Sequence, residues 1–324
     1  MPAPLFADYL VERRLLRRRL SFWRVSAFTV AALVVIILGL RLFGSDGAFN
    51  FSPRIARLSI TGIITGDRDT LKLISRIEDS DAAAVLVSIN SPGGTTTGAE
   101  RLFEAIRRLS AKKPTVAVVG TMAASGGYIA ALGADQIVAQ GNSLVGSIGV
   151  LVEYPNFTKL LDTIGVKVED VKSSPLKASP NGFEPTTPEA RAALASIVDD
   201  SFAWFKALVK DRRGMTDAQL AAVDDGRVFT GRQGRDLHLV DRIGGEREAI
   251  AWLEQEKSVP KGLKVRDWKP TQSLERLGIF SFAARGAALV HLDWLSQLFA
   301  QGDEFTRSRM LDGLVSIWQV DSAN

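Results

Sequence analysis

The sequence predicts an α/β domain with a mainly parallel sheet, preceded by one N-terminal helix that crosses a membrane. Between residues 55 and 255, short β-branched apolar segments alternate with amphipathic helical patterns. This alternation is typical of parallel strands joined by helical crossovers. A charge-free apolar segment lies closer to the N-terminus, at residues 25–40. The 324 residues, 46% of them hydrophobic, suffice for one large domain or two small ones.

The N-terminal region combines a basic cluster with this apolar segment. Residues 1–24 contain six arginines against Asp8 and Glu12, which accounts for the whole net charge of +4. We expect residues 1–23 to form a cytoplasmic basic segment, 24–43 a transmembrane signal anchor and 44–54 a linker. The positive-inside rule places the N-terminus in the cytoplasm and everything after the anchor outside it. A cleavable signal peptide is the alternative, but no convincing small-x-small cleavage site follows.

The strand and helix patterns then follow one another along the chain. Strand patterns cover 55–64, 82–89, 114–119, 135–139, 146–152 and 166–171. Helical patterns cover 67–79, 97–109, 129–132, 157–164, 188–210, 232–237 and 246–254. Two segments are predicted as loops, 90–94 and 172–180. After about residue 260 the character changes, and 280–299 is predicted to be an amphipathic packing or membrane-surface helix.

Composition excludes several kinds of chemistry. The chain has no cysteine, so it has no disulfide, thiolate metal site or cysteine nucleophile. It has only two histidines, which excludes a histidine-rich metal site. Outside the N-terminal cluster the basic and acidic residues balance, which gives no reason to propose nucleic acid as a partner. We expect neither a metal nor a cofactor.

A Gly/Ser-rich turn, Gly120–Tyr128, lies between a predicted strand and a predicted helix. Ser125 sits there among small residues, and the next amide, that of Gly126, lies near the start of the helix. A sharp strand-to-helix turn exposes a nucleophile and aims an N–H group at a developing oxyanion. The alternatives are an ordinary Gly/Ser-rich turn or a patch of small residues used for packing.

A serine nucleophile needs a base. His238 lies at an apolar helix-to-strand junction where packing explains it, and His291 lies in the tail. A lysine base must be neutral, whereas an ordinary lysine with a pKa of ~10.4 is neutral in about one molecule in a few thousand at pH 7. Burial lowers such a pKa. Lys177 has apolar or small neighbours and no carboxylate between Asp170 and Glu184, which makes it the candidate base; a solvated surface lysine is the alternative.

Four segments resemble the motif series of the signal peptide peptidase A family (peptidase family S49, short form), in that family's order and spacing. The resemblance covers roughly residues 55–255. The matching segments are Asn90–Gly94, Met122–Tyr128, Gly146–Val150 and Gly226–Gly231.

The resemblance implies a ClpP/crotonase-like fold of stacked β-β-α units over residues 55–260. The C-terminal extension over 261–324 is not part of the shared pattern. It implies Ser125 as the nucleophile and Lys177 as the general base of a Ser–Lys dyad. It also implies oxyanion-hole amides from Gly94 and Gly126. Ser147 would orient the lysine. This sequence departs from the family's Lys-Ser-Gly-Lys-Tyr-Lys stretch, which corresponds to residues 172–177. Pro175 and Leu176 replace its middle lysine and its tyrosine.

The expected function is that of a membrane-anchored serine endopeptidase (EC 3.4.21) that degrades cleaved signal peptides and other membrane-associated peptides. The expected location is the bacterial inner membrane, with the catalytic domain periplasmic, and the family's rings imply a homo-oligomer. One alternative is a crotonase-like acyl-CoA enzyme, against which the anchor and the Ser125/Lys177 pair argue. The other is a non-catalytic ClpP-like scaffold that organises membrane partners; loss of either residue would have favoured it.

Overall fold

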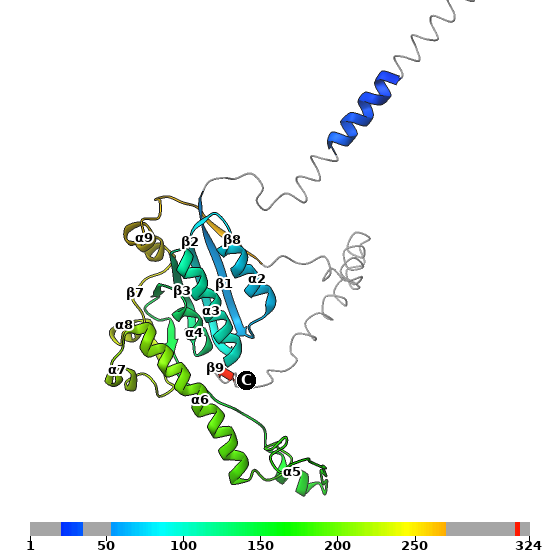
Figure 1. The fold of residues 1–324 in the computed structure, drawn as a ribbon, viewed down its shortest axis with the longest axis vertical. Coiled ribbons are helices and arrows are strands. Elements are labelled where there is room, and N and C mark those ends of the chain that lie inside the picture. Colours follow the sequence, from blue (N-terminus) through cyan, green and yellow to red (C-terminus); the bar gives the residue numbers. More distant parts are fainter. Residues whose placement is uncertain (1–20, 35–52, 270–314, 318–324) are drawn as a thin grey trace, which may run out of the picture. The chain divides into compact units, whose positions relative to one another are not determined.

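The computed structural model describes residues 21–34, 53–269 and 315–317 of the chain (Figure 1). Residues 21–34 are helical and belong to a unit separate from the one that starts at Pro53. Residues 35–43 of the predicted anchor and the predicted tail helix 280–299 lie outside the described residues. Within the described ranges, no helix has both the length and the apolar character needed to cross a bilayer.

The unit from Pro53 onward is built on one sheet. In the described part of the chain its strands run in the order β6-β5-β3-β2-β1-β8, with β4 and β7 continuing beside β3 and β9 beside β2. All pairings are parallel except β5 with β6 and β2 with β9. The bounds are β1 Arg54–Ile64, β2 Ala82–Thr95, β3 Thr115–Ala124, β4 Gln136–Ala139, β5 Leu144–Gly146, β6 Val228–Thr230, β7 Arg242–Ile243, β8 Val265–Trp268 and β9 Val315–Ile317. The predicted α/β class and mainly parallel sheet are therefore confirmed.

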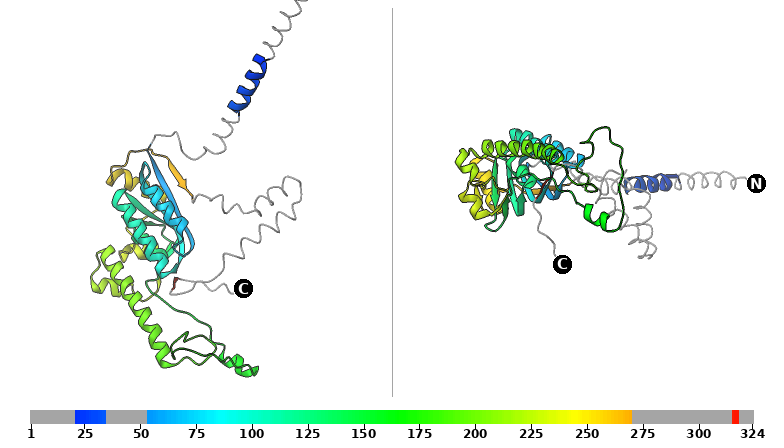
Figure 2. Two further views of the ribbon diagram at one scale, coloured as in Figure 1. Left: turned by 45° about the vertical axis from the view of Figure 1, so that its right-hand side comes forward. Right: turned by 90° about the horizontal axis from the view of Figure 1, so that it is seen from below.

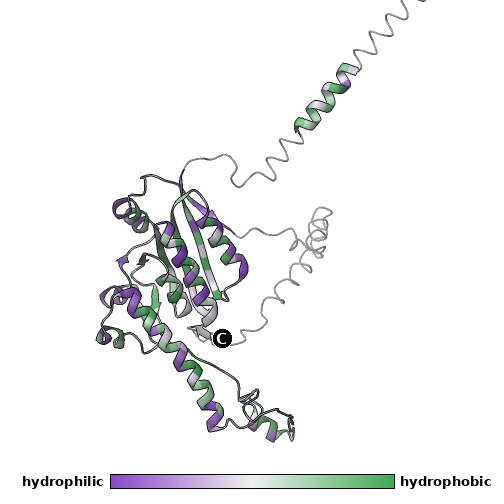
Figure 3. Cartoon of the chain, viewed as in Figure 1, coloured by the Kyte–Doolittle hydropathy of each residue, from purple (hydrophilic) through white to green (hydrophobic). Residues whose placement is uncertain are grey.

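Helices cover both faces of this sheet (Figures 1 and 2). Their bounds are α2 Arg68–Glu78, α3 Thr96–Lys112, α4 Gly126–Leu132, α5 Thr158–Thr163, α6 Pro188–Arg213, α7 Asp217–Ala221, α8 Gly231–Asp236 and α9 Glu246–Glu256. Residues of α2, α3, α4 and the C-terminal part of α6 share one hydrophobic core, and α9 contributes to a second. Both α2 and α3 carry hydrophilic residues on their exposed sides (Figure 3).

Strand β2 shows why the sheet is covered on both faces. Val85, Val87 and Ile89 belong to the larger core, whereas Ala84 and Leu86 belong to the α9 core. Alternate side chains of a strand point to opposite faces, so an unbroken apolar strand needs cover on each side. The sequence pattern of this strand thus already implies its central place in the sheet.

Three predicted elements differ from the structure. Of the strand predicted over 146–152, only Gly146 belongs to a strand, as the last residue of β5, and residues 147–150 have no regular structure. Residues 90–94, predicted as a loop, belong to β2, because Gly93 and Gly94 continue the ladder with Ile63 and Ile64 of β1. Residues 166–171, predicted as a strand, have no regular structure and are exposed. Alternation alone does not form a strand, because a strand needs a neighbouring strand to pair with, and no strand of the described chain pairs with residues 166–171. Residues 166–171 therefore have the sequence pattern of a strand without a neighbouring strand to pair with.

Residues 151–187 form an arm that extends from the sheet to the far end of α6 (Figures 1 and 2). The C-terminal part of α6 is held to the core by Phe205 and Val209, which are fully buried. On the arm and the N-terminal half of α6, large apolar side chains remain exposed. They include Leu160, Ile164, Val166, Val168, Val171, Leu176, Phe183 and Ile197.

Candidate active site

Ser125 occupies a strained backbone position between β3 and α4. Its φ is 54° and its ψ is −117°, a region that L side chains rarely adopt. Such a conformation costs about 1–3 kcal/mol and persists only when its surroundings impose it. The side chain is nearly fully buried, with 1% of its surface exposed. The sharp turn predicted from the sequence is present.

Packing of α4 against β2 imposes this turn. A Cβ on Gly127 would lie 2.6 Å from the carbonyl oxygen of Ser91, so only glycine allows the first turn of α4 to approach β2 this closely. The Ser91 hydroxyl donates to the Gly62 carbonyl at 2.7 Å and accepts from the Gly93 amide at 3.1 Å. The chain at the end of β2 is therefore fixed directly beside the nucleophile candidate.

Two loops complete the surroundings of Ser125. Its amide donates to the Gly146 carbonyl at 2.8 Å, and its hydroxyl lies 3.5 Å from the Gly149 carbonyl, a long hydrogen bond. Ser147 follows with a positive φ of 52°, and its amide donates to Arg227 O at 2.9 Å. Three of the sequence motifs thus meet at one place. The carbonyl partners Gly146 and Gly149 were not among the predicted site residues, although both belong to a quoted motif.

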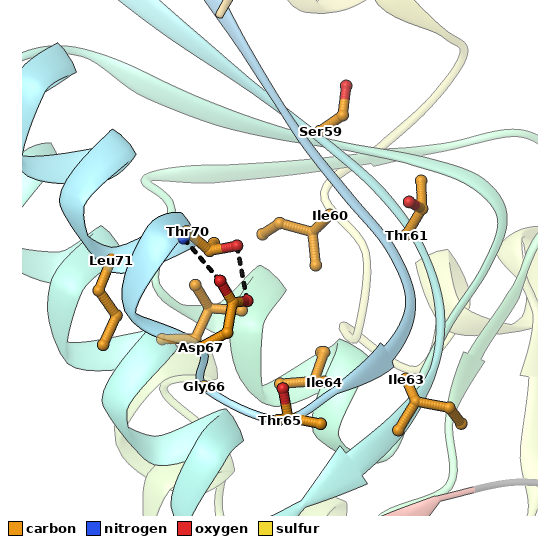
Figure 4. A pocket seen from close by; sticks show the side chains of 11 residues that line it. Ser59, Ile60, Thr61, Ile63, Ile64, Thr65, Gly66, Asp67, Thr70 and Leu71 are labelled. Carbon is orange, nitrogen blue, oxygen red and sulfur yellow. Dashed lines mark hydrogen bonds between the residues drawn. The ribbon is translucent and has the colours of Figure 1, made fainter. Parts of the chain in front are cut away.

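Gly94 lies at the carboxyl end of β2. A Cβ at this position would come within 1.9 Å of the Ile64 carbonyl oxygen, so no other residue fits against β1. Its other side pairs with Ser316 of β9. A cavity of about 150 Å³ lies nearby, between the end of β1 and the start of α2 (Figure 4). Asp67 there accepts from the amide and hydroxyl of Thr70, and none of the predicted site residues lines this cavity.

The two lysines of the predicted dyad loop have different surroundings. Lys172 pairs with Glu184 and with Asp170, at 3.0 Å from the latter, and these carboxylates raise the pKa of its ammonium group. Lys172 is therefore held in its charged form, which is unsuited to a base. Lys177 is exposed and lies on the arm, which leads away from the sheet and α4 (Figure 1). Within the described chain, the Ser125 turn lies beside the loop that holds Ser147, and α4 packs against β2 at Ser91, three residues before Gly94. Lys177 lies on the arm instead (Figure 1).

Behind the serine, α4 is anchored by a buried tyrosine. The Tyr128 hydroxyl donates to the Leu239 carbonyl at 2.9 Å, and burial raises the pKa of this phenol far above its ordinary value. Arg213 of α6 donates to the neighbouring His238 carbonyl at 2.6 Å and pairs with Asp241 at 2.7 Å. The packing role expected for His238 is wrong, because this residue is exposed, with a positive φ of 61°, and contributes only its backbone carbonyl. These contacts fix α4 to the C-terminal part of α6.

No group of histidine, cysteine, aspartate and glutamate side chains in the described ranges is arranged to hold a metal ion. This site offers the Ser125 hydroxyl and backbone amides. The amine of the predicted dyad, that of Lys177, lies on the arm. This set of groups is typical of acyl transfer through a serine nucleophile.

Comparison with known proteins finds peptidases. The model of peptidase family S49 matches residues 107–260. A putative protease of Synechocystis is 36% identical over 201 residues, 61% of this chain and 73% of that relative. Protease 4 of Haemophilus influenzae is 29% identical over 231 residues, 68% of this chain and 37% of its own length. A putative signal peptide peptidase SppA of Enterococcus faecium is 29% identical over 229 residues, 66% of each chain.

The matches differ in how much of each relative they cover. The chain spans about three quarters of the Synechocystis relative, two thirds of the Enterococcus one and little more than a third of the Haemophilus one. The family match includes the serine turn, the 146–150 motif and the arm.

Proposed function

Because the chain belongs to peptidase family S49, we propose that it is a serine endopeptidase in which Ser125 is the nucleophile and Lys177 the general base. The observation that carries this proposal is the strained, buried Ser125 between β3 and α4, held beside the 146–150 loop. A strained turn that places a serine at the start of a helix is an arrangement that serine nucleophiles use, although in the single chain Ser125 is nearly fully buried. A serine in a merely structural turn has no need of this strain.

The proposed reaction is acyl transfer in two steps. The Ser125 hydroxyl attacks the peptide carbonyl carbon while Lys177 Nζ takes the hydroxyl proton. The carbonyl oxygen becomes an oxyanion, to which the amides of Gly94 and Gly126 donate. The C–N bond breaks, Lys177 gives its proton to the leaving amine, and an ester on Ser125 remains. Water, deprotonated by Lys177, then hydrolyses that ester and restores the serine.

The position of Lys177 favours a site completed by a second copy of the chain. A lysine base works in its neutral form, which burial favours, whereas Lys177 is exposed in the single chain. The arm that holds it also exposes apolar side chains, such as Leu160 and Ile164, that a partner would cover. We therefore propose a homo-oligomer in which the arm of one copy brings Lys177 to Ser125 of its neighbour. Ser147, next to Gly146, would orient this lysine.

The proposed substrates are apolar peptides, in particular cleaved signal peptides and other membrane-associated peptides. The end of β2 offers backbone groups to an extended peptide, a mode that reads backbone more than sequence. The basic, apolar N-terminus would anchor the enzyme in the bacterial inner membrane with its catalytic domain on the periplasmic side. A relative named as a signal peptide peptidase supports this substrate class.

Hydrolysis of an apolar peptide by the full chain in detergent tests the proposal. We expect Ser125→Ala and Lys177→Ala each to lower kcat at least 10³-fold, in line with the loss of a nucleophile or its base. Lys172→Ala, a matched lysine removal on the same loop, and Ser110→Ala should retain activity. All variants must have the same assembly size and thermal stability as the wild type. Full activity of Lys177→Ala would place the base elsewhere, and an inert wild type would favour the scaffold function.

A further inference from the structure

The hydroxyl of Ser91 joins β1 to the end of β2, directly before the glycine whose amide is predicted to bind the oxyanion. The Ser91 side chain is fully buried. Its Oγ donates to the Gly62 carbonyl of β1 at 2.7 Å and accepts from the Gly93 amide at 3.1 Å. The hydroxyl therefore acts as donor and acceptor at once, and it fixes the backbone one residue before Gly94.

The strand pairing is irregular at this point. The register between β1 and β2 shifts after Thr61, so that Gly62 alone faces Ser91 and Pro92. Figure 4 labels Thr61 on β1 beside this step. Gly62 has a φ of 71° and Gly93 a φ of 115°, and Pro92 has no N–H group to donate. A bulge of this kind interrupts the regular ladder, and the Ser91 hydroxyl gives the Gly62 carbonyl and the Gly93 amide a partner there.

The same residue contacts the helix that follows the nucleophile candidate. A Cβ on Gly127 would lie 2.6 Å from the Ser91 carbonyl oxygen and 3.3 Å from the Ser91 Cβ. Gly127 comes directly after Gly126, whose amide is the second predicted oxyanion donor. One buried residue thus contacts both segments that hold the predicted amides, the end of β2 and the first turn of α4.

We propose that Ser91 is a positioning residue, which fixes the Gly93–Gly94 segment so that the Gly94 and Gly126 amides point at the same oxyanion. This inference rests on the proposed function of the Ser125 site. Amides stabilise an oxyanion only when they are already aimed at the position that its oxygen takes in the transition state. Loss of the Ser91 hydroxyl releases the segment at Gly93, and a displacement of about 1 Å costs about a hundredfold in rate.

The variant Ser91→Ala should therefore lower kcat by about 10-fold to 100-fold. Its KM should change by less than about twofold, because an interaction made only in the transition state contributes to kcat and not to ground-state binding. A second variant, Ser91→Cys, fills the space of the hydroxyl with a weaker hydrogen-bonding group. It should lower kcat in the same direction, which guards against a folding defect that a cavity in Ser91→Ala would cause.

The matched control is Ser143→Ala. Ser143 is 3% exposed, and its hydroxyl likewise donates to a backbone carbonyl, that of Gly120, at 2.5 Å and accepts from the Gln140 amide at 3.1 Å. Both alanine variants lose a buried hydroxyl that joins two backbone segments, so both should unfold at a lower urea concentration than the wild type. Only the substitution at Ser91 should change kcat.

The assay uses the full chain in detergent, with an apolar peptide substrate and the corresponding peptide aldehyde as inhibitor. The Ser125 oxygen bonds to the aldehyde carbon, Lys177 takes the hydroxyl proton, and the former carbonyl oxygen lies where the oxyanion forms. Because such an adduct resembles the transition state, its Ki should rise in Ser91→Ala by the factor by which kcat/KM falls. A merely structural defect lowers the fraction of active enzyme and with it the apparent kcat, but leaves Ki unchanged.

The outcomes separate this inference from the proposed function. With an active wild type, an unchanged Ki in Ser91→Ala would overturn the positioning role, whether or not kcat falls, and would leave the proposed function in place. An equal rise of Ki in Ser143→Ala would overturn it too. A wild type that neither hydrolyses the peptide nor binds the aldehyde would overturn the proposed function, and the role of Ser91 with it.

Discussion

Among single residues, Ser125 stands out by its backbone conformation. A positive φ in a residue with a side chain is uncommon, and this one lies where β3, α4 and the 146–150 loop meet. Glycine would relieve the strain. A serine kept in a conformation better suited to glycine indicates that its hydroxyl, and not the turn, is what the position requires.

Substitution of Ser125 by glycine and by alanine should separate strain from chemistry. Both variants lose the hydroxyl and should be inactive. Ser125→Gly should be more stable than Ser125→Ala by about 1 kcal/mol, because only glycine adopts φ 54° and ψ −117° without strain. Urea unfolding of the two full-length variants measures the difference. Equal stabilities, or a more stable alanine variant, would mean that the turn stores no strain.

At the scale of elements, local sequence patterns predict most of this fold and long-range pairing accounts for the rest. The apolar segments at 55–64, 82–89 and 114–119 give β1, β2 and β3, because a buried strand needs little more than an apolar β-branched sequence. Gly93 and Gly94 look like a loop in the sequence and become strand only because β1 and β9 flank them. Strand β8, within the predicted extension, pairs with β1 and was not predicted.

In the candidate site too, the sequence predicts the local features but not the long-range contacts. The serine turn is local, so strand, glycines and helix predicted its sharp bend, but they did not predict the near-complete burial of Ser125. The carbonyls of Gly146 and Gly149 contact Ser125 although they lie more than twenty residues later in the chain. In the sequence, only the motif at 146–150 indicated them. The place of Lys177 depends on how the arm is arranged and covered, which no pattern within residues 172–180 specifies. Its role as the base stays a prediction.

The N-terminus of α9 gives a prediction for pH. The Gly245 amide donates to the Glu248 carboxylate at 2.7 Å, and this bond lowers the pKa of Glu248. A depressed pKa means that the carboxylate stabilises the fold above its unfolded pKa of about 4.3 and that this contribution is lost as the pH falls through the folded value. Amide exchange protection in α9 should therefore decrease below about pH 4 in the wild type.

The matched variant is Glu248→Gln, which cannot ionise. Its α9 protection at neutral pH should already be below that of the wild type, and should change less between neutral and acidic pH. The same pH dependence in both proteins would show that Glu248 is not the group responsible.

At the scale of the whole molecule, the arm and the exposed Lys177 connect assembly with catalysis. A single chain holds Ser125 and the predicted oxyanion amides on the sheet and holds Lys177 on the arm that extends from it (Figure 2). The exposed apolar residues of the arm, such as Val168 and Leu176, need a partner surface. We expect a closed ring of identical copies, in which each site takes residues from two of them.

Mixing two inactive variants tests this arrangement. Ser125→Ala and Lys177→Ala chains, dissociated and reassembled together at equal amounts, should regain about a quarter of the wild-type activity, because a quarter of random neighbouring pairs combine an intact serine with an intact lysine. Each variant reassembled alone is the control. If the mixture stays inactive while its assembly size matches that of the wild type, serine and lysine come from one chain.

Covalent labelling tests whether Ser125 is a nucleophile. The full chain is treated with a fluorophosphonate and the adduct is located by peptide mass spectrometry. The account predicts one adduct, on Ser125, which is absent from Ser125→Ala and greatly slowed in Lys177→Ala. An adduct on another serine, such as Ser147, or no adduct on a correctly assembled protein, would contradict it.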